Sequence, residues 1–164
     1  MAGLRKDVFD GIVGLLISEG KLVERKHCLA LPEHQEKFSD EEQELLRNIE
    51  SLFRDRLFSP PGFDEVVESV SIAPEEVRKI IRVMVEQERL VRIDKELLFH
   101  SDAIEKAREL LISFIKEKGG LESVKFKYLL NTTRKFAIPL LDYFDRIGLT
   151  LRDGYTRYLR SPVR

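Results

Sequence analysis

The strongest constraint on the fold is a pattern that occurs three times along the chain. Each copy consists of an amphipathic helix, a short break and two strand-like runs joined by a turn. The breaks contain Gly20, Arg89 and Gly148, which lie 69 and 59 positions apart. This spacing is the size of a small domain, and it is too long for a solenoid repeat. The three copies cover residues 12–31, 77–99 and 136–159.

Further helices are predicted upstream of the second and third copies. Apolar residues at helical spacing, together with capping and stop signals, place them near residues 39–53, 63–69, 102–116 and 124–130. In the third copy, Asp153-Gly154 between two alternating runs is a strong signal for a β-hairpin. Three helices followed by a hairpin are the elements of a winged helix. The predicted fold is therefore mostly α (α+β), with tandem winged-helix domains of three helices and a small β-hairpin wing.

The same pattern predicts three modules. Residues 1–35 contain only a last helix and its wing, so we expect a partial winged-helix module. Residues 36–100 form a complete module. Glu75 and Glu76 at the start of its third helix would repel phosphate, so we expect this module to act as a spacer. Residues 101–164 form a complete, basic module, in which we expect RNA binding.

Charge is distributed unevenly along the chain, although the formal net charge is only -1. Residues 1–122 hold 19 Lys and Arg against 26 Asp and Glu, whereas residues 123–164 hold 9 against 3. A basic segment attached to an acidic remainder indicates that one part of the chain contacts a polyanion.

The sequence offers little for catalysis or for a metal site. His27, His34 and His100 are scattered, Cys28 is the only cysteine, and no zinc-binding or nucleophile motif is present. A single cysteine cannot form an internal disulfide, which agrees with a reducing compartment. No run of 18 apolar residues and no signal peptide occur, so we expect a cytoplasmic protein with no membrane contact.

Basic residues of the last module lie where a winged helix meets phosphates. Two are on its second predicted helix, two are in the first turn of its third helix after a run of capping residues, and three are on the wing. A wing tyrosine can stack on an exposed base. The alternative is that these cations are solvated and balance Asp142, Asp145 and Asp153. The candidates are Lys125 and Lys127; Asn131, Thr132 and Thr133 as caps; Arg134 and Lys135; and Arg152, Tyr155, Arg157 and Arg160.

Residues 126–150 resemble a known family. A basic helix start is followed by Ala137-Ile138-Pro139-Leu140-Leu141 and then by Phe144-Asp145-Arg146-Ile147-Gly148. This motif is similar to that of the last winged-helix domain of the SelB family, the bacterial selenocysteine-specific translation elongation factors. Residues 36–100 resemble the preceding winged helix, and residues 1–35 resemble the end of the one before it.

The resemblance implies that the last module binds the mRNA hairpin, a SECIS-type element, that directs selenocysteine incorporation at UGA codons. Arg134, Lys135 and Arg157 are then the principal contacts. Carried over position by position, the implied RNA-binding residues are Lys125, Lys127, Thr132, Thr133, Arg134, Lys135, Arg152, Tyr155 and Arg157.

The resemblance also implies what this chain does not do. In that family GTP and Mg²⁺ belong to an N-terminal part that has no counterpart here, so we expect neither a cofactor nor catalysis. The expected partner is the mRNA hairpin, with the ribosome as a second candidate, and the chain is expected to be a monomer.

Two other functions stay open at this point. One is a winged-helix DNA-binding regulator, although the third helix turns acidic after its first turn, at Asp142 and Asp145. The other is a protein-interaction fragment, in which the acidic modules contact ribosome or factor partners and the basic patch is incidental.

Overall fold

The computed structural model describes residues 6–25, 28–30 and 39–160, which divide into two compact units, Met1–Glu41 and Glu42–Arg164. The first unit contains α1 (Lys6–Ser18) and the strands β1 (Val23–Arg25) and β2 (Cys28–Ala30). The two strands pair antiparallel, which confirms the predicted helix and hairpin. The turn residue His27 and the downstream His34 lie outside the described residues.

Three helices and a hairpin open the second unit. They are α2 (Asp40–Asp55), α3 (Phe63–Val70), α4 (Pro74–Glu86), β3 (Leu90–Arg92) and β4 (Leu98–His100). Pro74 occupies the first turn of α4, where a residue without an amide hydrogen is tolerated. The helix positions agree with the apolar spacing of the sequence.

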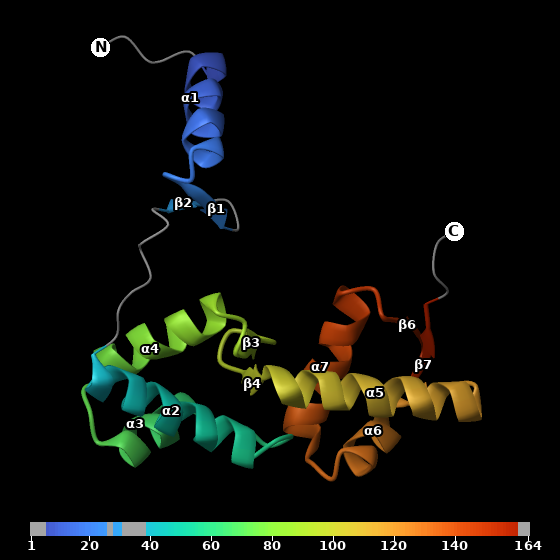
Figure 1. The fold of residues 1–164 in the computed structure, drawn as a ribbon. Helices are drawn as coiled ribbons and strands as arrows, with labels where there is room; N and C mark the ends of the chain where they lie inside the picture. Colours follow the sequence, from blue (N-terminus) through green and yellow to red (C-terminus); the bar gives the residue numbers. More distant parts are fainter. Residues whose placement is uncertain (1–5, 26–27, 31–38, 161–164) are drawn as a thin grey trace. The chain divides into compact units, whose positions relative to one another are not determined.

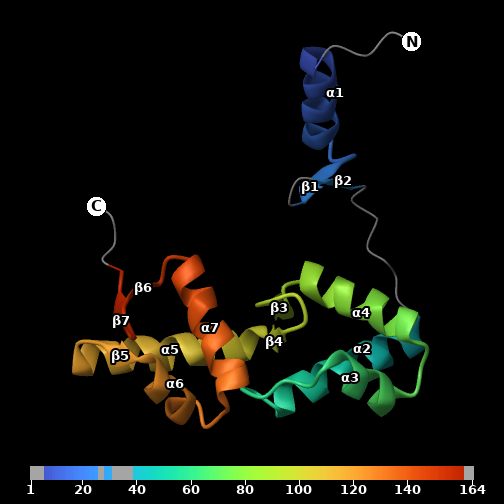
Figure 2. The ribbon, with the colours of Figure 1, turned by 180° about the vertical axis from the view of Figure 1, so that it is seen from behind.

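The C-terminal part begins without a linker, because β4 runs directly into the next helix (Figures 1 and 2). The three strands of this part form an antiparallel sheet in the order β5-β7-β6. Three helices and a wing in this order are those of a winged helix. The elements are α5 (Ser101–Lys118), β5 (Leu121–Glu122), α6 (Ser123–Leu129), α7 (Arg134–Arg146), β6 (Thr150–Asp153) and β7 (Thr156–Leu159).

The breaks between helix and hairpin use the left-handed backbone region. Gly148 ends α7 with φ 77°, and Gly154 makes the wing turn with φ 59°, conformations that a glycine adopts without a steric penalty. In the middle copy the equivalent residue is Glu88, with φ 62°. The left-handed position therefore falls one residue before Arg89.

One hydrophobic core joins the middle segment, from α2 to β4, to the C-terminal part, from α5 to β7. Ile93 and Phe99 belong to the same buried cluster as Leu111, Phe126 and Phe144. The Phe99 ring meets the Phe136 ring edge to face, with a centroid distance of 6.5 Å. Two parts that share buried side chains should unfold together, so the middle segment does more than separate its neighbours.

Helix α7 continues through Pro139. Since proline has no amide hydrogen, the carbonyl of Lys135 lacks its donor four residues later. Nothing in the structure explains why proline occupies this position.

Among residues 6–25, 28–30 and 39–160, no helix combines the length and the apolar character needed to cross a membrane.

Candidate nucleic-acid interface

The start of α7 is open to an anion. Thr133 is the N-cap, and its carbonyl accepts the amides of Phe136 at 3.2 Å and Ala137 at 3.0 Å. Its hydroxyl makes no capping hydrogen bond. The amides of Arg134 and Lys135, which come before these two in the first turn, have no partner within the helix, and no cap side chain covers them. They can therefore donate to a phosphate.

Two cations lie on this first turn. Arg134 is exposed, and its side chain forms no hydrogen bond or ion pair with any residue that the structure describes. Lys135 is also exposed, and its Nζ lies 5.3 Å from the centroid of the Phe136 ring. Both positive charges remain available to a ligand.

Helix α6 adds the predicted cation Lys127 and, beside it, an aromatic ring that sequence reasoning missed, Tyr128. Nζ of Lys127 lies 4.3 Å from the centroid of the Tyr128 ring. Tyr128 is 70% exposed, so the ring keeps one surface for a base. In the sequence Tyr128 is marked only by its position next to Lys127 on a short helix. Helical periodicity does not distinguish an exposed tyrosine from a buried one at such a position.

The wing presents a second aromatic ring. Tyr155 is 82% exposed. Its carbonyl accepts hydrogen bonds from the amide and the hydroxyl of Ser123, both at 2.9 Å. Nε of Arg152 donates to the carbonyl of Gly154 at 3.0 Å. The backbone of the turn is thus fixed to the start of α6 while the Tyr155 ring stays free.

Arg157 does not lie on the surface, contrary to its predicted role as a principal RNA contact. It is 1% exposed, because its strand position points into the core. Its Nη2 donates to Asp142 at 2.8 Å, its Nε donates to Asp145 at 3.2 Å, and its Nη1 donates to the hydroxyl of Ser123. A guanidinium enclosed in this way cannot reach a phosphate. For Arg157, the alternative of a cation that balances Asp142 and Asp145 is correct, although its guanidinium is buried rather than solvated.

Two further candidates already have protein partners. The hydroxyl of Thr132 donates to the carbonyl of Phe58 at 2.6 Å and lies 2.9 Å from the hydroxyl of Ser59, so it joins the α7 start to the middle segment. Nζ of Lys125 is 2.8 Å from Oε1 of Glu122. An exposed pair of this kind is weak, and Lys125 can exchange its partner.

An acidic side chain borders this surface. The pKa of Glu65 is held below its usual value mainly because Arg56 donates a hydrogen bond to it at 2.8 Å, with a second bond from the amide of Gly62 at 2.9 Å. The charge of Lys135 acts in the same direction. Glu65 is therefore ionised, and its negative charge lies close enough to Lys135 to interact with it.

The corresponding helix of the middle segment has the opposite character. Glu75 and Glu76 occupy the first turn of α4, and Arg78 donates to Glu75 at 2.8 Å. Negative charge at this terminus disfavours a phosphate there. Within the described part of the chain, no three His, Cys, Asp or Glu residues are grouped in a way that could hold a metal ion.

Comparison with known proteins agrees with this winged helix. Residues 113–159 match the family model described as the winged helix of elongation factor SelB. The chain is 29% identical over 158 residues to the selenocysteine-specific elongation factor of Escherichia coli K12, with 94% of this chain and 25% of that protein covered. The corresponding factor of Desulfomicrobium baculatum is 24% identical over 159 residues, with 97% and 25% covered. The chain spans about a quarter of the length of these curated relatives.

Solved structures give the same result. The mRNA-binding domain of SelB from E. coli, solved in complex with SECIS RNA, has a TM-score of 0.65 and 29% identity, and the match covers 76% of this chain and all of that one. A bacterial selenocysteine-specific elongation factor EF-Sec has a TM-score of 0.59 at 18% identity, covering 97% of this chain and 26% of that one. The second match shows the fold alone. The chain is similar to the C-terminal winged-helix region of SelB, as the motif in residues 126–150 predicted.

Proposed function

We propose that this chain binds an mRNA hairpin of the SECIS type, as the RNA-binding part of a selenocysteine-specific elongation factor. The observation that carries the proposal is the open start of α7, where Arg134 and Lys135 lie beside uncovered backbone amides. The likeness to the SelB domain solved in complex with SECIS RNA supports it.

Cations and aromatic rings of this surface have different roles in the proposed binding. Arg134, Lys135 and the first-turn amides hold phosphates of the stem, and these contacts position the RNA without reading its sequence. Side chains cannot reach base edges in the deep, narrow groove of A-form RNA, so specific contacts fall on unpaired bases. The exposed rings of Tyr128 and Tyr155 supply surfaces on which such bases stack.

The proposed contact set differs from the set implied by the sequence. Arg157 leaves it because the side chain is buried, and Tyr128 enters it because the ring is exposed. Thr132 acts through its bond to Phe58 and positions the α7 start. The proposed contacts are Lys125, Lys127, Tyr128, Thr133, Arg134, Lys135, Arg152 and Tyr155.

The proposal also covers the other segments of the chain. Residues 36–100 and 101–164 act as tandem winged-helix modules, preceded by the partial module of residues 1–35, and none of them performs catalysis or holds a cofactor. GTP and Mg²⁺ belong to another part of the factor. The chain acts as a monomer in the cytoplasm, and the ribosome is a second candidate partner.

Replacing Arg134 with alanine should weaken hairpin binding by about 1.5–3 kcal/mol, and Lys135→Ala should do the same, because each removes a hydrogen bond between two charged groups, the side chain and a phosphate. Fluorescence anisotropy with a labelled SECIS-type hairpin measures the change. Arg82→Ala is the matched control, since Arg82 is an exposed arginine on α4. Equal, small losses in all three variants would instead indicate diffuse charge attraction.

A further inference from the structure

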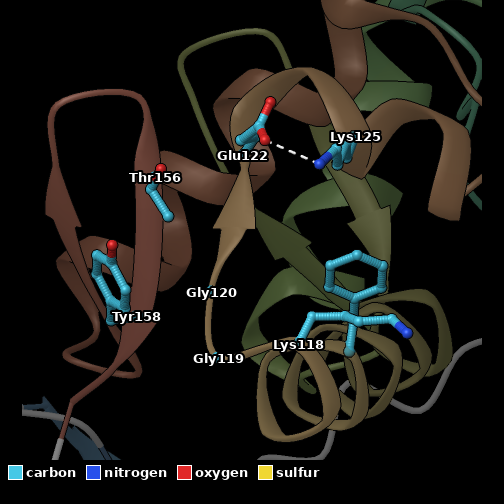
Figure 3. Close-up of a pocket in the computed structure, with 8 residues that line it drawn as sticks. Lys118, Gly119, Gly120, Glu122, Lys125, Thr156 and Tyr158 are labelled. Carbon is cyan, nitrogen blue, oxygen red and sulfur yellow. Dashed lines mark hydrogen bonds and ion pairs between the residues drawn. The ribbon is translucent and has the colours of Figure 1, made fainter.

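An open groove lies beside the wing, where α5 ends and β5 begins (Figure 3). Its volume is about 480 Å³, within the range of small-molecule sites. Figure 3 shows Thr156 and Tyr158 of β7 on one side, Lys118 and Lys125 on the other, and the backbone of Gly120 between them.

The shape of the groove depends on Gly120. A Cβ atom at this position would lie 2.9 Å from Cγ2 of Thr156 and 3.0 Å from Cε1 of Tyr158, closer than carbon atoms pack. The requirement is spatial, because the positive-φ glycines of the chain do not include Gly120. The Tyr158 ring therefore rests against a bare backbone and has a defined position.

The groove combines aromatic surface with positive charge. Tyr158 is 42% exposed, and Phe114 contributes a second, partly buried ring to the lining. Nζ of Lys118 lies 2.7 Å from Glu117, and Nζ of Lys125 lies 2.8 Å from Glu122, which also lines the groove. Both ion pairs are well exposed and hence weak. A phosphate can replace either carboxylate at small cost.

We infer that this groove binds one unpaired nucleotide of an RNA strand, with the base against Tyr158 and the phosphate held by Lys118 and Lys125. The inference rests on the proposed RNA-binding function and adds a second contact to it. A paired base cannot enter a concave site, whereas an unpaired base has a free face that stacks on an aromatic ring. An acidic peptide would use the two lysines alone and would leave the Tyr158 ring unused.

A titration of the full chain with a single-stranded RNA of five nucleotides tests this, followed by the amide signals of Gly119 and Gly120 in a ¹H–¹⁵N spectrum. Signals of both glycines should shift. An abasic strand with the same backbone should bind at least about fivefold more weakly, because stacking contributes about 1–3 kcal/mol per base.

Variants separate the ring from the charges. Tyr158→Ala should abolish the shifts at Gly119 and Gly120, whereas Tyr158→Phe, which keeps the ring, should retain them. Gly120→Ala should also abolish the shift at Gly119, because the new methyl group displaces the Tyr158 ring. Circular dichroism confirms that each variant is folded.

Three results would overturn the inference. The glycine signals could stay in place, the abasic strand could bind as well as the intact strand, or a pentaglutamate peptide could produce the same shifts at the same concentration. Hairpin affinity of the Arg134→Ala variant is measured alongside. If Arg134→Ala does not weaken hairpin binding, the proposed function is contradicted. If the Gly119 and Gly120 signals do not shift, the groove inference is contradicted, so the two failures are distinguishable.

Discussion

Replacing Arg157 with alanine should lower the free energy of unfolding by about 3 kcal/mol, the lower end expected when one partner of a buried ion pair is removed. The guanidinium is 1% exposed and donates to Asp142, Asp145 and Ser123. Without it the Asp145 carboxylate, 21% exposed, loses its cationic partner at a largely buried position. The loss stays at the lower end because Asp142 is 54% exposed. Urea unfolding followed by circular dichroism measures the change.

Two controls distinguish a buried arginine that stabilises the fold from an arginine that only adds surface charge. Arg134→Ala removes an exposed arginine from the same part of the chain and should change stability by less than about 0.5 kcal/mol. Combining Arg157→Met with Asp145→Asn should recover part of the loss, because no buried charge is then left alone. If Arg157→Ala unfolds at the same urea concentration as the unaltered chain, the buried arginine does not stabilise the fold.

Replacing Phe99 with alanine should destabilise all of residues 42–164 by about 3–5 kcal/mol. The ring is fully buried, and it meets Phe136 on α7 in the core that joins the two parts. Because the cluster is shared, the expected unfolding curve has a single transition at a lower denaturant concentration. Differential scanning calorimetry with near-ultraviolet circular dichroism detects this.

Tyr155→Ala is the control for the aromatic deletion, since Tyr155 is 82% exposed and its removal should leave stability nearly unchanged. A second transition appearing in Phe99→Ala, with the C-terminal part unfolding as before, would mean that the parts are independent. The same core explains why residues 101–164 alone should not retain the full binding affinity. Removing residues 1–100 takes away Phe99 and Ile93 and exposes the apolar surfaces they cover.

Local elements could be predicted from the sequence because their signals are local. Helix α7 follows from apolar spacing that ends at Gly148, and the wing follows from Asp153-Gly154 between alternating runs. The predicted resemblance to the SelB winged helix is confirmed for residues 113–159.

Features that depend on contacts between distant segments could not be predicted. Strand β5 has only two residues, too few to show alternation, and it forms by pairing with β7. The burial of Arg157 depends on Asp142 and Asp145, which lie three residues apart on α7 and so point the same way. That spacing was visible in the sequence, but only the sheet brings Arg157 to it. Thr132 likewise gains its role from Phe58, 74 residues earlier.

The burial of Arg157 also determines which cations remain available to neutralise phosphates. The four cations best placed for phosphates are Lys127 on α6, Arg134 and Lys135 on α7, and Arg152 on the wing. Neutralising about four phosphates gives a slope of about -3 to -4 for log affinity against log salt concentration. Since this charge contribution is modest, stacking on Tyr128 and Tyr155 should supply a part of the affinity that salt does not remove.

A salt titration of two RNAs of equal length, a SECIS-type hairpin with unpaired loop and bulge bases and a fully paired duplex, tests the proposed hairpin recognition most directly. Fluorescence anisotropy gives both affinities at each salt concentration. We expect the hairpin to remain bound at moderate salt with a slope of about -3 to -4, while duplex binding collapses. Equal affinities and equal slopes for the two RNAs would contradict hairpin recognition and leave only a basic surface.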